Sequence, residues 1–227
     1  MFLLKQRARK LGRRLFHRLY HGYALRQIAK PSTRLLGRTL LTDPDVFHPV
    51  YFLSTKVFLD YLATLDLAGK RFLDMGTGSG AVGIFAAARG AQVTACDINP
   101  RAVRLAARNA QGNGVQMEVV ESDLFDALDG RLFDVIAFNL PFYAEVPRPP
   151  MGVAFYAGPN FETIRSFAAG CRRALAPGGS VVVIFSEDSG RDRVVALFEA
   201  EAFASVDEHV ASRFFERFHL LKLHAVP

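Results

Sequence analysis

The chain has 227 residues, half of them hydrophobic, and a formal net charge of +6. This length and composition predict one globular domain with a substantial core, and no apolar run approaches the ~20 residues of a membrane-spanning helix. The cysteines Cys96 and Cys171 lie far apart, outside any Cys/His cluster. We therefore expect reduced thiols in the core of a cytoplasmic protein, and neither a disulfide framework nor a bound metal.

The positive charge is concentrated at the N-terminus. Residues 1–42 contain eleven Lys and Arg and no acid, whereas residues 43–227 contain 17 basic and 22 acidic residues. Apolar residues recur at helical spacing before Pro31, which predicts a basic amphipathic helix in an N-terminal arm over residues 1–45. Such an arm suits a phosphate backbone, an acidic protein, a ribosome or a membrane surface, and an organellar transit peptide has a similar composition. The cations available for contact include Arg7, Lys10, Arg13, Arg14 and Arg18.

The remainder, residues 46–227, is predicted to be one α/β domain. A connector broken by prolines at 42–52 precedes a helix at 54–65. Strands are then predicted at 71–76, 91–98, 115–122, 133–139, 180–186, 205–212 and 215–226. Helices are predicted at 79–90, 99–114, 161–179 and 190–203, the second with Asn99 as N-cap. This alternation predicts a doubly wound, mostly parallel sheet covered on both faces, with an antiparallel hairpin at one edge.

A glycine-rich segment, "LDMGTGSGAVG", lies where the first strand of the alternating region meets its helix. Gly76, Gly78 and Gly80 allow tight turns and close approach of a ligand. Asp97 ends the next strand about 20 residues later, where an acid can accept hydrogen bonds from both ribose hydroxyls. The glycines and the acid together predict a nucleotide site at the carboxyl ends of the strands.

The charges near the glycines indicate which nucleotide binds. Gly78, Gly80 and Gly83 spell the dinucleotide pattern GxGxxG, but Asp74 precedes the first glycine and the loop contains no Lys or Arg. A carboxylate there would repel a pyrophosphate and attract a cation. S-adenosylmethionine (SAM) carries a sulfonium and an ammonium group and no phosphate, so we expect SAM. Asp123 follows the third strand, where it can accept a hydrogen bond from an adenine amine.

The motifs "LDMGTGSGAVGIFAA", "SDLF" and "FDVIAFNLPFY", in this order and spacing, resemble those of class I SAM-dependent methyltransferases. More narrowly, they resemble the branch whose fourth strand ends in Asn-Pro-Pro-Tyr. That branch contains release-factor glutamine N-methyltransferases, ribosomal-RNA guanine N2-methyltransferases and N6-adenine enzymes. The resemblance implies a seven-stranded sheet with the last strand antiparallel. It also implies that the segment beginning "FHPVYF" folds over the cofactor. The predicted cofactor contacts are Asp74, Gly76, Thr77, Gly78, Gly80, Asp97, Ile98, Asp123, Leu124 and Asn139.

The segment Asn139–Phe142 is the candidate catalytic element. Methyl transfer requires the nitrogen lone pair to be aimed at the methyl carbon, and two acceptors that bind its N–H groups can orient it. Asn139 Oδ1 and the Leu140 carbonyl suit this role, and Pro141 stiffens the turn between them. The chain departs from the branch, because Leu140 replaces the first proline and Phe142 replaces the tyrosine. Aromatic side chains available to contact the substrate are Phe142, Tyr143, Phe155 and Tyr156.

Three functions follow as hypotheses. The first is an N-methyltransferase acting on a planar amide or amine nitrogen in protein or RNA, which the basic arm favours. The second is a methyltransferase for a small molecule, which the altered motif and the long loop at 140–159 suit equally well. The third is an oxidoreductase that binds an NAD-type dinucleotide. The sequence does not define the accepting atom or the oligomeric state.

Overall fold

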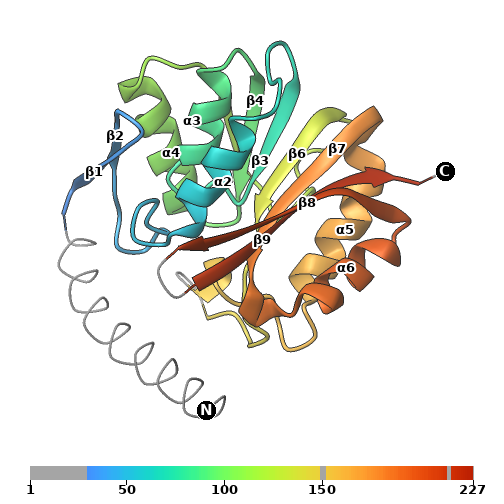
Figure 1. Ribbon diagram of the computed structural model, residues 1–227. Coiled ribbons are helices and arrows are strands. Elements are labelled where there is room, and N and C mark those ends of the chain that lie inside the picture. Colours follow the sequence, from blue (N-terminus) through green and yellow to red (C-terminus); the bar gives the residue numbers. More distant parts are fainter. Residues whose placement is uncertain (1–29, 149–151, 214–215, 227) are drawn as a thin grey trace, which may run out of the picture.

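The computed structural model describes residues 30–148, 152–213 and 216–226. A seven-stranded sheet of order β5-β4-β3-β6-β7-β9-β8 runs through the molecule (Figure 1). The strands are β3 (Arg71–Met75), β4 (Gln92–Asp97), β5 (Glu118–Glu121), β6 (Phe133–Asn139), β7 (Leu175–Ser186), β8 (Phe203–Arg213) and β9 (Glu216–Ala225). All pairs are parallel except those that β9 forms with β7 and β8. The predicted doubly wound sheet with its antiparallel last strand is confirmed.

Helices cover both faces of the sheet. One face carries α2 (Ser54–Leu62), α3 (Ala81–Ala87) and α4 (Pro100–Gly112), and the other carries α5 (Glu162–Ala174) and α6 (Arg191–Glu199) (Figure 1). Because strand side chains alternate between faces, Val135 and Ala137 of β6 pack with the α2–α3 cluster. Ile136 and Phe138 pack with the α5–α6 cluster. This burial on both sides explains why β6 is a continuous apolar run.

The fourth predicted helix ends earlier than the sequence suggested. Residues 175–179 were assigned to it, but α5 stops at Ala174 and β7 begins at Leu175. Pro177 disfavours helical conformation at the preceding Ala176. Leu175 is already extended, at ψ 127°, and pairs with Phe133 of β6. The predicted N-cap is confirmed: the Asn99 side chain accepts a hydrogen bond from the Arg101 amide, and Pro100 occupies the first turn.

Residues 32–41, which were assigned to the N-terminal arm, form a hairpin that the sequence did not predict. Strands β1 (Ser32–Leu35) and β2 (Arg38–Leu41) pair antiparallel, and the turn uses positive φ at Leu36 and Gly37. The hairpin is fixed to α4, because the Asn109 side chain bonds both the amide and the carbonyl of Leu41, at 2.7 and 3.1 Å. Each strand has only four residues, too few for alternation to be recognised. The predicted helix of the basic arm lies outside the described residues.

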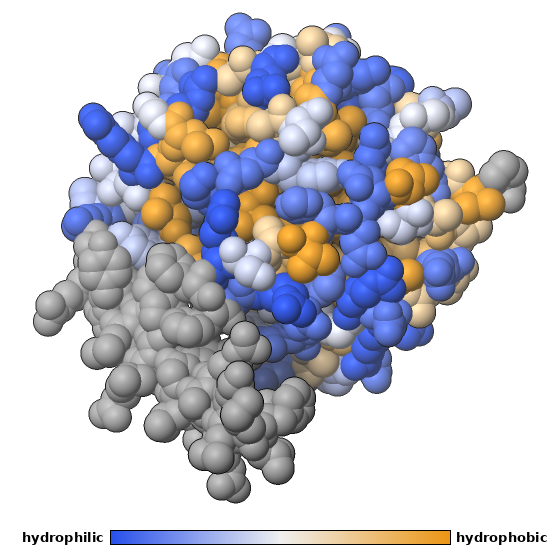
Figure 2. All heavy atoms as spheres, viewed as in Figure 1, coloured by the Kyte–Doolittle hydropathy of each residue, from blue (hydrophilic) through white to orange (hydrophobic). Residues whose placement is uncertain are grey.

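The edge strand β8 is exposed along most of its length. Polar residues surround separate hydrophobic patches on the face shown in Figure 2, and Val206 and Val210 are among the exposed apolar side chains. Charged side chains of β8 bond to neighbouring elements: Asp207 to Tyr61, and Glu208 to Arg191. Charged side chains at a sheet edge oppose pairing with other chains. No helix in the described part of the chain is long and apolar enough to cross a membrane.

Candidate active site

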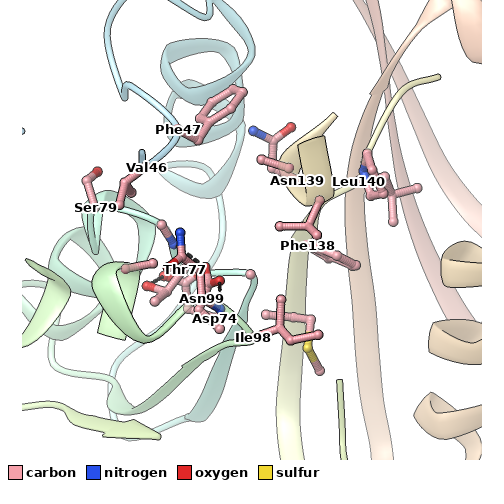
Figure 3. A pocket seen from close by; sticks show the side chains of 18 of the residues that line it. Val46, Phe47, Asp74, Thr77, Ser79, Ile98, Asn99, Phe138, Asn139 and Leu140 are labelled. Atoms are coloured by element: carbon pink, nitrogen blue, oxygen red, sulfur yellow. Dashed lines mark hydrogen bonds between the residues drawn. The ribbon is translucent and has the colours of Figure 1, made fainter. Parts of the chain in front are cut away.

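A cavity of about 350 Å³ lies at the carboxyl ends of β3, β4 and β6. Because these strands are parallel, their last residues, including Asp97 and Asn139, reach the same edge of the sheet. Figure 3 shows Asp74, Thr77 and Ile98 on one side of the cavity and Phe138, Asn139 and Leu140 on the other. Every predicted cofactor contact lies in the cavity wall except Gly80, which is the N-cap of α3 directly behind it.

The glycine loop is held by the acid that precedes it. Asp74 Oδ2 accepts hydrogen bonds from the Thr77 hydroxyl at 2.6 Å and from the Gly83 amide at 2.8 Å. Gly76 has φ +62°, and a Cβ there would lie 2.7 Å from the Phe138 ring. A side chain at this position is therefore excluded both by backbone conformation and by space. The charge of Asp74 was anticipated from the sequence, whereas its structural contacts with the loop were not.

Burial raises the pKa of Asp74 to about 7, although the bonds from Thr77 and Gly83 act in the opposite direction. A carboxyl with this pKa exchanges its proton near neutral pH, and a nearby cation would favour the ionised form. Burial also raises the pKa of Asp97, although hydrogen bonds from the amides of Asn99, Gly78 and Ile98 act to lower it. Its Oδ2 accepts from the Gly78 amide at 2.8 Å, which ties the glycine loop to β4.

Among the described residues, those that line the cavity include four carboxylates and no Lys, Arg or His. The carboxylates are Asp45, Asp74, Asp97 and Asp123. Such a wall disfavours phosphate and suits a cation. The cavity therefore fits the sulfonium and ammonium groups of SAM, with Asp97 available to the ribose and the exposed Asp123 to the adenine.

The end of β6 forms the opposite wall. The Asn139 amide group lies on the side facing Phe47 (Figure 3). Its Nδ2 donates to Ser54 Oγ at 3.1 Å, and its Oδ1 is buried without a hydrogen-bond partner among the described residues. A buried acceptor without a donor costs free energy. An N–H group of a bound molecule would satisfy it. The next residue, Leu140, is buried and donates its amide to the Ile184 carbonyl at 3.0 Å.

The aromatic candidates for substrate contact divide into two pairs. Phe142 and Tyr156 line the cavity, whereas Tyr143 and Phe155 do not. The Phe155 ring packs against Phe47 and Phe52, with centroids 5.5 and 4.9 Å away. The backbone of Tyr143 bonds to that of Phe155 and Ala157, which ties the start of the 140–159 loop to its end. These contacts join the loop to the connector before α2 above the cavity.

That connector contributes wall residues that were not named individually from the sequence. Val46, Phe47 and Pro49 line the cavity, as does Thr55 at the start of α2. The resemblance implied this segment, but only the packed structure shows which side chains face inward. His48 does not line the cavity. Its Nδ1 accepts from the Val50 and Tyr51 amides, and burial lowers its pKa to about 4.

Known proteins resemble this chain in sequence and fold. Ribosomal RNA small subunit methyltransferase C of Chromohalobacter salexigens is 37% identical over 151 residues, which are 65% of this chain and 42% of that protein. A Methanocaldococcus jannaschii protein, provisionally named a protein N5-glutamine methyltransferase, is 39% identical over 165 residues, 70% of this chain and 81% of its own length. A solved structure of the Thermus thermophilus 16S rRNA N2 G1207 methyltransferase, in complex with AdoMet and guanosine, has a similar fold, with a TM-score of 0.61. The match has 21% sequence identity and covers 86% of this chain and 50% of the chain of that structure.

The chain thus spans less than half the length of the first of these relatives. A family model, described as the methyltransferase small domain, matches residues 37–215, which begin in the β1–β2 hairpin and end just before β9. On this match, the chain belongs to the methyltransferase small domain family.

Proposed function

We propose that this protein transfers a methyl group from SAM to a planar amide or amine nitrogen of a protein or RNA. The observation that carries the proposal is the buried, unpartnered Oδ1 of Asn139 at the cavity that fits SAM. An acceptor in this position distinguishes a nitrogen that carries N–H groups from an ether or carbonyl oxygen, which has no hydrogen to donate.

The carboxylate wall would hold the methyl donor. Bound SAM supplies a methyl carbon made electrophilic by the sulfonium charge. Asp97 would accept from the ribose hydroxyls and Asp123 from the adenine amine, while Asp74 would stabilise the positive charge of the ligand. The glycine loop allows the backbone to approach the ligand closely, and Phe47 covers the cavity from the connector side.

The end of β6 would orient the acceptor nitrogen. Asn139 Oδ1 and the Leu140 carbonyl would each accept one N–H of the substrate, which aims the lone pair at the donor side of the cavity. Positive charge develops on the nitrogen during transfer, and fixed acceptor dipoles stabilise it. Phe142 and Tyr156, which line the cavity, offer aromatic faces to a planar group. The reaction requires no general base before the methyl group is transferred.

Two relatives bear names that specify ribosomal RNA or protein glutamine as substrate, and both substrates present a planar nitrogen. This supports a macromolecular acceptor for the present chain. The basic residues of the arm, Arg7, Lys10, Arg13, Arg14 and Arg18, would then hold a phosphate backbone or an acidic protein surface. If the arm binds RNA, affinity should fall steeply as the salt concentration rises.

The test is transfer of labelled methyl from SAM into a lysate fractionated into RNA, protein and small molecules. We expect label in RNA or protein. Asn139→Ala should reduce the turnover more than tenfold while the Kd for SAM, measured by calorimetry, changes less than threefold. Label confined to small molecules would favour the metabolite alternative. Binding of NAD in place of SAM, or unchanged turnover in the variant, would overturn the proposal.

A further inference from the structure

Two serine hydroxyls outside the segment Asn139–Phe142 are bonded to its two ends. Asn139 Nδ2 donates to Ser54 Oγ at 3.1 Å, and Ser189 Oγ donates to the Phe142 carbonyl at 2.9 Å. Ser54 is the first residue of α2, and Ser189 is the last residue of the short 3-10 helix η2 (Glu187–Ser189). Both serines are buried, with 1% and 3% of their surface exposed. Elements distant in the sequence therefore hold this segment.

Ser54 holds one end of the Asn139 amide and leaves the other end free. Because Nδ2 is engaged with Ser54, Oδ1 is left without a partner. Rotation of the amide by half a turn would place two N–H donors where the acceptor now lies, and these donors cannot accept a substrate N–H. In the observed arrangement, the side chain of Asn139 is thus held by a residue 85 positions away in the sequence.

The centre of the segment is held by a bond that the related motif cannot form. The Leu140 amide donates to the Ile184 carbonyl at 3.0 Å. A proline in place of Leu140, as in Asn-Pro-Pro-Tyr, has no N–H and would be rigid through its ring instead. With Leu140 present, the conformation of the segment depends more on hydrogen bonds from neighbouring elements.

The short helix η2, which carries Ser189, is itself fixed to the sheet. The Asp188 amide donates to Ser186 Oγ at 3.2 Å within η2. Glu187, the first residue of η2, contacts Nε2 of the buried His219 on β9 at 2.9 Å. These contacts limit movement of η2, so the Ser189 hydroxyl reaches the Phe142 carbonyl from a fixed position.

We propose that Ser54 and Ser189 are positioning residues for methyl transfer: Ser54 orients the Asn139 amide so that Oδ1 accepts the substrate N–H, and Ser189 fixes the backbone at Phe142. This inference rests on the proposed function, because it concerns the acceptor side of that same site. It adds two residues that lie outside the motif.

A measurement without substrate tests the Ser54 contact. The chain contains five asparagines, so selective 15N labelling gives five side-chain amide signals, and Asn139→Ala identifies the one needed. In Ser54→Ala we expect the Asn139 Nδ2 protons to exchange with water at least tenfold faster, while Ser54→Thr, which keeps the hydroxyl, restores slow exchange. Should Ser54→Ala fail to fold, Ser54→Cys provides a near-isosteric replacement with a weak acceptor. Unchanged exchange in the folded variant would overturn the role of Ser54.

The kinetic test compares Ser54→Ala and Ser189→Ala with Ser180→Ala. Ser180 is a matched control, because it is a buried serine on β7 that pairs with Val135, near the opposite end of β6 from Asn139. We expect kcat to fall at least tenfold in Ser54→Ala and at least threefold in Ser189→Ala, with the Kd for SAM within threefold of wild type, and Thr at either position to restore most of the rate. Rates equal to that of Ser180→Ala would overturn the proposal. If wild type methylates no fraction, the proposed function fails, and the exchange measurement still decides whether Ser54 orients Asn139.

Discussion

The two walls of the cavity differ in how their polar groups are satisfied. The donor wall is the side that would hold the methyl donor. There, Asp74 and Asp97 accept hydrogen bonds at 2.6 to 2.9 Å from the glycine loop and from the amides of Gly83 and Asn99. On the acceptor side, Asn139 Oδ1 has no partner among the described residues. The donor wall is therefore internally bonded before any ligand binds, whereas the acceptor wall has a buried acceptor that is available to a bound molecule. Substitutions in the donor wall should therefore affect stability and cofactor binding together, and substitutions in the acceptor wall should affect turnover.

The largest effect is expected on the donor wall, at Gly76. Gly76→Ala would place a Cβ 2.7 Å from the Phe138 ring at φ +62°. We expect a loss of about 2–4 kcal/mol in the free energy of unfolding, together with loss of SAM binding. Gly130→Ala is the matched control, because Gly130 has φ +72° and open space around it, so only the backbone cost of about 1 kcal/mol remains. Equal denaturant midpoints for the two variants would show that the Phe138 contact is unimportant.

A pH-dependent effect of similar size on stability, but without complete loss of SAM binding, is expected at Asp74. Since burial raises its pKa to about 7, the stability contributed by the protonated carboxyl is complete below about pH 4 and is lost as the pH rises through 7. Asp74→Asn keeps an acceptor oxygen and does not titrate. It should therefore gain stability relative to wild type over this range, by on the order of 2–4 kcal/mol at pH 8.

The same variant should bind SAM more weakly, because the cation loses a carboxylate partner. We expect about a tenfold weaker Kd at pH 8 and a smaller difference at pH 5, where wild type is also protonated. Chemical denaturation and calorimetry across pH 5–8 measure both quantities. A stability difference that does not vary with pH would show that Asp74 does not titrate in this range.

The smallest effect is expected at Arg101, which is half exposed and bridges Asp43 and Asp45 at 3.3 and 2.7 Å. Arg101→Ala should lower the free energy of unfolding by less than about 0.5 kcal/mol and leave the Kd for SAM within threefold, because exposed ion pairs contribute little. Asn99→Ala, which removes the N-cap of α4 and the bond to the Asp45 carbonyl, should cost about 1 kcal/mol. Thermal melts of both variants rank the two contacts, and a larger loss for Arg101 would reverse the ranking.

Much of the fold was predictable, because the sheet is buried on both faces and its strands are apolar runs separated by amphipathic helices. The wrong predictions concern an element too short to show a side-chain period, and a segment near a proline where the helical period continues in the sequence although the helix has ended. The four-residue strands β1 and β2 were assigned to the N-terminal arm without a hairpin, and the β7 residues before Pro177 were assigned to a helix. In both places the backbone conformation is stabilised by pairing with a distant segment, which sequence periodicity does not reveal.

The sequence by itself determined the sheet, the glycine loop and the residues at the strand ends. These depend on local properties, namely side-chain period, glycine conformation and the position of an acid after a strand. Only the tertiary structure decided that Asp74 holds the glycine loop, that Phe155 packs on Phe47 and Phe52, and that Ser54 and Ser189 hold the two ends of Asn139–Phe142. The physical reason is that a hydrogen bond between residues dozens of positions apart exists only after the sheet and helices have packed.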